Sequence, residues 1–129
     1  MSLLLDTAVL VDYLRGRPQA IAYIDALDDS VLVSSITVAE LYAGVREGDE
    51  RTALDALIGV LEVVDVTAEI ACVGGLYRRD YGKSHGVGLA DALIAASAES
   101  QGASLVTLNA RHFPMLRGVV VPYEPHSLP

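Results

Sequence analysis

Short apolar runs alternate with helical stretches along almost the whole chain, and this alternation restricts the possible folds more than any other feature. The runs predicted to be strands are Leu3–Leu5, Val31–Ser35, Glu62–Val66, Ser104–Thr107 and Val119–Val121. Strands that alternate with helices form a mainly parallel sheet, because each crossover places a helix against one face of the sheet. We therefore expect an α/β fold with about five strands, flanked by helices on both faces.

The helices expected between these strands are bounded by capping residues, Gly or Pro. They run from Thr7 to about Arg15, over Pro18–Leu27, from the cap Thr37 to about Gly48, over about Glu50–Leu61, from about Ala68 to Arg79, and over Leu89–Gln101. Gly82–Gly88 is predicted to be a glycine-rich loop. The Leu89–Gln101 helix is apolar on nearly every side, so we expect it to be buried.

The composition is that of one folded domain. The 129 residues are predicted to form a single domain over 1–129, and a hydrophobic content of 52% argues against disorder. No stretch approaches the roughly 18 apolar residues of a membrane span, and the N-terminus lacks the basic residues of a signal peptide. Cys72 is the only cysteine, which we interpret as a buried thiol of a reduced, cytoplasmic protein.

The chain is acidic, with a formal net charge of −8. This charge repels nucleic acid at long range, so contact with nucleic acid requires a local basic patch or bound metal ions. The same acidity suits a basic protein partner. All but one of the nine cationic residues are Arg, whose forked guanidinium favours phosphate and carboxylate groups.

Three acidic residues stand almost alone in apolar sequence: Asp6, Glu40 and Asp91. Each is embedded in a segment that is typical of the protein interior, and no Lys or Arg lies close to it in sequence. An ionised carboxylate is costly to bury unless it is paired or bound to a metal. If the fold brings the three together, a divalent cation is their simplest shared partner.

The predicted topology places polar residues at one edge of the sheet. Asp6 follows the first strand, Glu40 lies early in the helix after the second strand, and Asn109 follows the fourth. Asp91 lies in the first turn of a helix that must start from the same side. Binding sites in open parallel sheets form outside the carboxyl ends of the strands. We therefore expect these four residues to meet there.

Each of these residues also has a purely structural interpretation. Asp6 can be a helix cap, and Asp91 can be a first-turn acid favoured by the helix dipole. Asn109 can be a turn residue, although its amide oxygen is also suited to binding a hard cation. Glu40 is hardest to explain structurally, because its neighbours are apolar. Thr107 can add a hydroxyl group to the site.

Four segments in this order resemble the PIN domain, and more closely the VapC toxins of VapBC toxin–antitoxin pairs. The segments are DTAVLVDYL (6–14), SSITVAELYAGV (34–45), LADALIAASA (89–98) and TLNARHF (107–113). The resemblance extends from about Leu3 to Val121. It implies a PIN-like parallel sheet with acidic residues clustered at one end.

The resemblance also implies an activity, a Mg²⁺- or Mn²⁺-dependent endoribonuclease, and a role as the toxin of a type II system. Asp6, Glu40 and Asp91 correspond to the core acids of the family, which makes them catalytic and metal-ligating candidates. Asn109 lies where many PIN domains carry a fourth Asp and completes the catalytic set. The expected partners are a VapB-like antitoxin, an RNA substrate such as tRNA or rRNA, and a second copy of the chain. The alternative is a catalytically weak or inactive PIN-like protein or RNA-binding module, which the departure at Asn109 keeps open.

The remaining basic residues are weaker candidates for ligand contact. The histidines lack the spacing of zinc ligands and are interpreted as surface or loop residues: His85, His112 and His126. Candidate RNA contacts are Arg15, Arg17, Arg46 and Arg111. Pairing with neighbouring acids is the better explanation for Arg46 and Arg51.

Overall fold

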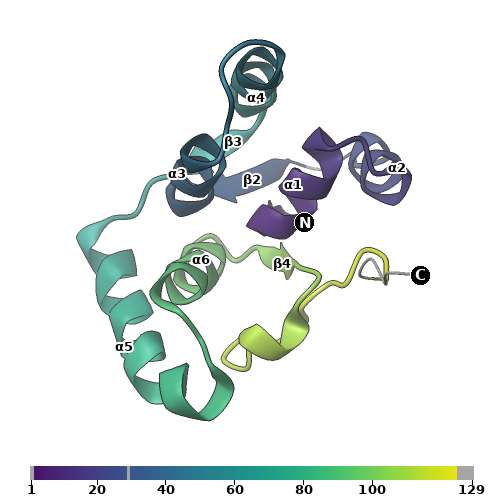
Figure 1. Ribbon diagram of the computed structural model, residues 1–129. Coiled ribbons are helices and arrows are strands. Elements are labelled where there is room, and N and C mark those ends of the chain that lie inside the picture. The colour runs from purple at the N-terminus through teal and green to yellow at the C-terminus, as the bar shows by residue number, and fades with distance from the viewer. Residues whose placement is uncertain (1, 29, 125–129) are drawn as a thin grey trace.

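A parallel four-stranded sheet forms the centre of the protein, in a computed structural model that describes residues 2–28 and 30–124 (Figure 1). The strands are β1 (Leu3–Leu5), β2 (Val31–Ser34), β3 (Glu62–Val64) and β4 (Ser104–Val106). Their order is β3-β2-β1-β4, and every neighbouring pair is parallel. The α/β prediction is thus confirmed, with four strands in place of about five.

The fifth predicted strand, Val119–Val121, is reduced to one parallel bridge between Val120 and Val106. The Val120 N–H donates to the Leu105 carbonyl at 2.8 Å, and its carbonyl accepts from the Thr107 N–H at 2.9 Å. Gly118 precedes this bridge with a φ of 68°. Pro122 follows and has no N–H to extend the pairing. The chain therefore touches the sheet edge without forming a strand.

The helices lie between the strands in the predicted order. They are α1 (Thr7–Leu14), α2 (Pro18–Asp25), α3 (Ser35–Ala43), α4 (Asp49–Val60), α5 (Ala68–His85), α6 (Leu89–Ser100) and the 3₁₀ turn η1 (Ala110–His112). None of those in the described ranges is long and apolar enough to cross a membrane.

Three helix boundaries differ clearly from the prediction, and one of them is the end of α3, which lies at Ala43 rather than near Gly48. Helix α5 continues to His85, so Gly82 lies inside it and the predicted loop shrinks to 86–88. Gly86 ends the helix because it adopts the left-handed conformation, with a φ of 66°. Helix α3 is capped by Ser34, whose Oγ accepts from the Ile36 N–H at 3.1 Å, rather than by Thr37.

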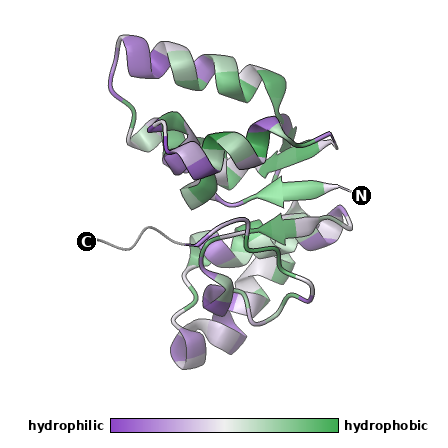
Figure 2. Cartoon of the chain, turned by 90° about the vertical axis from the view of Figure 1, so that its right-hand side faces the viewer, coloured by the Kyte–Doolittle hydropathy of each residue, from purple (hydrophilic) through white to green (hydrophobic). Residues whose placement is uncertain are grey.

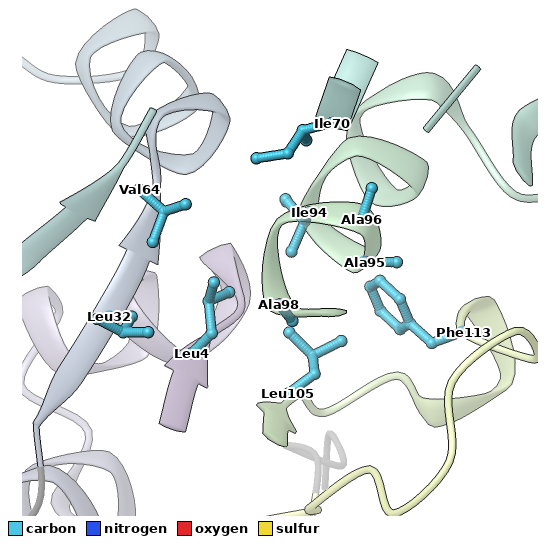
Figure 3. Packing of buried hydrophobic residues seen from close by; sticks show 10 residues of the cluster. All are labelled: Leu4, Leu32, Val64, Ile70, Ile94, Ala95, Ala96, Ala98, Leu105 and Phe113. Carbon is cyan, nitrogen blue, oxygen red and sulfur yellow. The ribbon is translucent and has the colours of Figure 1, made fainter. Parts of the chain in front are cut away.

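Helices cover both faces of the sheet, because the strands are apolar on both sides (Figure 2). One face packs against α5 and α6, and Figure 3 shows the side chains that fill this layer: Leu4, Leu32, Val64, Ile70, Ile94, Ala95, Ala96, Ala98, Leu105 and Phe113. The opposite face packs against α1, α3 and α4 through Leu5, Val9, Leu10, Val33, Leu41, Leu54, Leu57 and Val106. Alternate residues of each strand thus enter opposite cores.

The strand order creates a switch point beside β1. The chain adds β2 and then β3 on one side of β1, and the α5–α6 connection carries it to β4 on the other side. The helix that follows β1 and the helix that precedes β4 lie on opposite faces of the sheet. This arrangement leaves a crevice between β1 and β4 at the carboxyl edge. The residues that follow these two strands are therefore positioned to form a site.

The thiol of Cys72 is exposed, so the prediction of a buried cysteine is wrong. Helix α5 packs mainly against α6, and its buried residues are Ile70 and Gly74. Cys72 lies between these two positions on the helix and faces outward. His126 lies outside the described residues.

Two adjacent glycines in α5 provide a test of the packing between α5 and α6. A Cβ atom on Gly74 would lie 2.6 Å from Cδ2 and 3.2 Å from the backbone Cα of Leu93, whereas a Cβ on Gly75 meets nothing within 4 Å. We expect Gly74→Ala to lower the free energy of unfolding by about 1–3 kcal/mol. Gly75→Ala should raise it by roughly 0.5–1 kcal/mol through helix propensity. Urea denaturation of both variants measures the difference, and equal shifts would contradict the close packing at Gly74.

Candidate active site

A cleft of about 300 Å³ lies at the carboxyl edge of the sheet. It is lined by Asp6, Thr7, Ala8, Glu40, Asp91, Asn109, His112 and Phe113. The four residues predicted from the sequence are thus brought together, from the ends of β1 and β4 and from α3 and α6. Thr7 and His112 line the cleft as well, although neither was among the predicted site residues.

Asp6 is the buried member of the site, with 7% of its surface exposed. Its Oδ1 accepts from the Thr7 N–H at 2.8 Å as the cap of α1, and its Oδ2 accepts from the Thr107 hydroxyl at 2.6 Å. Asp6 is therefore the N-cap of α1 and also lines the cleft. Burial raises the pKa of Asp6, the two hydrogen bonds oppose this rise, and the charges of Asp91 and Glu40 add to it.

The Thr107 hydroxyl is fully buried and joins two parts of the site, because it also accepts from the Asn109 N–H at 3.0 Å. We expect Thr107→Val to lower the free energy of unfolding by about 1–3 kcal/mol, since Asp6 and Asn109 lose a partner. The loss should be larger at pH 7 than at about pH 3, where the Asp6 carboxyl is largely protonated in the folded and the unfolded state.

The direction of this pH dependence follows from the effect of the Thr107 hydroxyl on the pKa of Asp6. The hydroxyl donates to the ionised carboxylate, so its removal raises the pKa of Asp6 further and penalises the ionised form alone. Urea denaturation at the two pH values, with the exposed Thr52→Val as the control, measures the effect. A loss that is independent of pH would mean that the hydroxyl stabilises only the Asn109 backbone.

Glu40 is exposed, which corrects the expectation that its apolar neighbours would bury it. Helix α3 turns Thr37 and Leu41 toward the core, whereas Glu40 lies on the cleft side. Its Oε1 accepts from the Thr7 hydroxyl at 2.7 Å, and the Thr7 and Thr37 hydroxyls are 2.9 Å apart. Thr7 has a single hydroxyl proton, so Thr37 must donate to Thr7. Two threonines therefore hold the Glu40 side chain at the cleft.

Asp91 is half-buried in the first turn of α6, and the imidazole of His112 is the only basic side chain of the described residues beside its carboxylate. The Nδ1 atom of His112 lies 3.4 Å from Asp91 Oδ2 and 2.8 Å from Asn109 Nδ2. Burial raises the pKa of Asp91 and the charge of Glu40 adds to this, while His112 opposes it. His112 is one-third exposed in the 3₁₀ turn η1, in agreement with its interpretation as a surface or loop residue, and it also lines the cleft, which its sequence context did not indicate. Its spacing from Asn109, three residues in a tight turn, was the available signal.

The three carboxylates fit a divalent cation in chemical character. No Lys or Arg pairs with Asp6, Glu40 or Asp91 in the ranges that the structure describes. Their mutual repulsion favours a cation between them, and carboxylate oxygens are the ligands that Mg²⁺ prefers. The three carboxylates line one cleft but are not yet close enough to share a cation, because the described residues contain no group of three His, Cys, Asp or Glu placed to hold a metal ion. The exposed Glu40 and the half-buried Asp91 would have to turn inward.

Comparisons with known proteins agree with this arrangement. The PIN domain family matches residues 3–117. Ribonuclease VapC19 of Mycobacterium tuberculosis is 41% identical over 93% of this chain and 98% of its own length, and Ribonuclease VapC10 of the same organism is 36% identical over 94% and 92%. The tRNA(fMet)-specific endonuclease VapC of Salmonella typhimurium is 31% identical over 92% and 95%.

Solved structures show the same similarity. A toxin–antitoxin complex from Klebsiella pneumoniae contains a chain with a TM-score of 0.82 and 27% identity, which covers 95% of this chain and 99% of that one. VapBC2 from Rickettsia felis, bound to a promoter DNA fragment, gives a TM-score of 0.75 and 26% identity over 93% and 96%. The chain therefore belongs to the PIN domain family and, within it, to the VapC-like proteins.

Proposed function

We propose that this protein is a Mg²⁺- or Mn²⁺-dependent endoribonuclease that acts as the toxin of a type II toxin–antitoxin system. The observation that carries the proposal is the cleft itself. Carboxylates from β1, α3 and α6 line it, and no Lys or Arg of the described residues neutralises them. The names of the curated relatives, which are ribonucleases, support RNA as the substrate class.

In this proposal, Asp6, Glu40 and Asp91 hold the cation, and the Asn109 amide supplies a further oxygen. A divalent cation in such a site activates water and neutralises charge on the phosphate. The protein holds Asp6 through Thr107 and the Thr7 N–H. Glu40 Oε2 accepts no hydrogen bond from the described residues. This oxygen leaves Glu40 able to accept a proton from the attacking water.

Contact with RNA requires a cation beside the cleft, because the net charge of −8 repels phosphates. Arg111 lies in η1 next to His112 and has no carboxylate partner among the described residues. Arg17, by contrast, pairs with a carboxylate at 2.9 Å. Arg46 and Arg51 pair with neighbouring acids, as the sequence indicated. Arg111 is therefore our first choice for a phosphate contact.

The proposed partners follow from the same family. The solved relatives are toxin–antitoxin complexes, which supports a VapB-like antitoxin that neutralises this protein. The tRNA specificity in the name of the Salmonella relative makes tRNA the first substrate to test, with rRNA as the second. A homodimer and a cytoplasmic location belong to the proposal and rest on the family resemblance.

The proposal is tested by incubating the purified protein, freed of antitoxin, with tRNA and rRNA in Mg²⁺ or Mn²⁺. Discrete fragments should form, and they should disappear with EDTA or in Glu40→Gln. Because Glu40 is exposed, this variant should fold normally. Glu69→Gln, an exposed substitution in α5 outside the cleft, is the matched control and should cleave like the wild type.

Two results would contradict the proposal. Fragments that persist in Glu40→Gln would place the cleavage in another site or in a contaminating enzyme. The absence of both cleavage and Mn²⁺ binding would favour the inactive or RNA-binding alternative.

A further inference from the structure

One nitrogen atom joins two residues of the cleft that come from different elements. Nδ1 of His112 lies 2.8 Å from Nδ2 of Asn109, which follows β4, and 3.4 Å from Oδ2 of Asp91, which begins α6. The shorter of these contacts has the geometry of a hydrogen bond, whereas the longer one is beyond the usual range. The imidazole is therefore held mainly by Asn109, with Asp91 beside it.

The chemistry of this hydrogen bond determines which end of the amide remains free. An amide nitrogen only donates, so the neutral imidazole of His112 accepts from Asn109 Nδ2 at Nδ1 and carries its proton on Nε2. The amide oxygen of Asn109 is then left without a partner among the described residues. If the amide were turned over, it would present nitrogen, which is not a ligand for Mg²⁺ or Mn²⁺.

We propose that His112 is a positioning residue that orients the Asn109 amide so that its oxygen is available to the cleft. This inference rests on the proposed metal-dependent function, because a bound cation is what the oxygen would contact. Residues behind the direct ligands commonly set ligand orientation in metal sites. A carboxylate at this position would present an oxygen to the cleft in either orientation, whereas the Asn109 amide has only one oxygen. His112 thereby allows Asn109 to take the place of a fourth carboxylate.

The imidazole is not needed to hold the turn itself. The His112 N–H donates to the Asn109 carbonyl at 3.0 Å, and the Phe113 N–H donates to the Ala110 carbonyl at 3.0 Å. Phe113 anchors the segment in the core with 2% exposure, whereas the His112 side chain is one-third exposed. Removal of the ring should therefore leave the fold intact.

The sequence offers a direct spectroscopic test, because Asn109 is the only asparagine. A ¹⁵N–¹H spectrum contains one asparagine side-chain NH₂ pair and those of two glutamines, Gln19 and Gln101. The asparagine pair is identified by its loss in Asn109→Asp. In the wild type, one proton of the pair should be shifted downfield by the bond to the imidazole.

We expect His112→Ala to return this pair to the position of a solvent-exposed amide. His112→Asn should preserve part of the shift, because its side-chain oxygen lies near the position of Nδ1 and can accept the same bond. His85→Ala, which removes an exposed imidazole of α5 outside the cleft, should leave the pair unchanged. An unchanged pair in His112→Ala would overturn the inference.

Mn²⁺ affinity, measured by calorimetry, is the second readout. His112→Ala should weaken it about tenfold, within the range for residues that support metal ligands, and His112→Asn should recover most of the loss. Equal affinity in the wild type and in His112→Ala would refute the positioning role even if RNA cleavage is normal. The absence of cleavage by the wild type would instead contradict the proposed function, because the amide signal and Mn²⁺ affinity are measured without RNA.

Discussion

Asp91→Asn is expected to abolish RNA cleavage while the metal-free protein remains at least as stable as the wild type. Asp91 is half-buried, and its pKa is raised by burial and by the charge of Glu40, so the ionised carboxylate is unfavourable in the folded protein. A neutral amide of the same shape removes that cost. It also removes a proposed ligand, and the loss of several kcal/mol of charge stabilisation corresponds to at least about a 10³-fold fall in the cleavage rate.

The stability of this variant should depend on pH in a defined direction. A carboxyl group whose pKa is raised by folding contributes its stability below the unfolded pKa, about 4, and loses it as the pH rises through the folded pKa. The stability of Asp91→Asn relative to the wild type should therefore increase from about pH 4 to pH 7. Metal-free thermal denaturation at both pH values measures this, with the exposed Asp65→Asn as the control.

A lower stability of metal-free Asp91→Asn would indicate a structural role for Asp91. The dipole of α6 favours an acid in its first turn by about 0.3–1 kcal/mol, and His112 lies beside Asp91. If these contributions dominate, metal-free Asp91→Asn will melt below the wild type at pH 7. Asp91 would then be a structural residue of α6, and its place in the proposed metal site would lose its support.

Residues that follow strands were the easiest part of the site to predict. A residue that closely follows a buried parallel strand lies near the carboxyl edge, so Asp6 and Asn109 were placed by topology alone. The environments of residues on helices were harder to predict. Glu40 has apolar neighbours, but Ala and Gly tolerate both the core and the surface, and the pattern did not reveal that this side of α3 faces the cleft.

The contacts of His112 depend on tertiary structure and were therefore missed. Asp91 and His112 are 21 residues apart and meet only because α6 and η1 start from the same edge of the sheet. Gly82 was wrongly predicted to lie in a loop, because a glycine tolerated within a helix looks like a helix end in the sequence. Only Gly86 has the positive φ that ends α5.

The core behind the cleft provides the second large prediction. Phe113 is the only phenylalanine, has 2% exposure, and packs among residues of α6 and β4 (Figure 3). We expect Phe113→Ala to lower the free energy of unfolding by about 3–5 kcal/mol, because the truncation leaves a cavity in a packed layer. This is a large part of the 5–15 kcal/mol that is typical of a whole domain. Urea denaturation of the metal-free protein measures the loss.

Phe113→Leu is the matched variant, because it keeps most of the buried volume and should cost less than about 1.5 kcal/mol. Phe113 also lines the cleft and directly follows His112, so the cavity should loosen η1 as well as the core. Mn²⁺ affinity should therefore fall in Phe113→Ala at temperatures where the protein remains folded, and it should stay near the wild-type value in Phe113→Leu. A stability loss below 1 kcal/mol in Phe113→Ala would contradict the packing of this layer. A normal Mn²⁺ affinity in a destabilised Phe113→Ala would show that η1 keeps its geometry without the anchor.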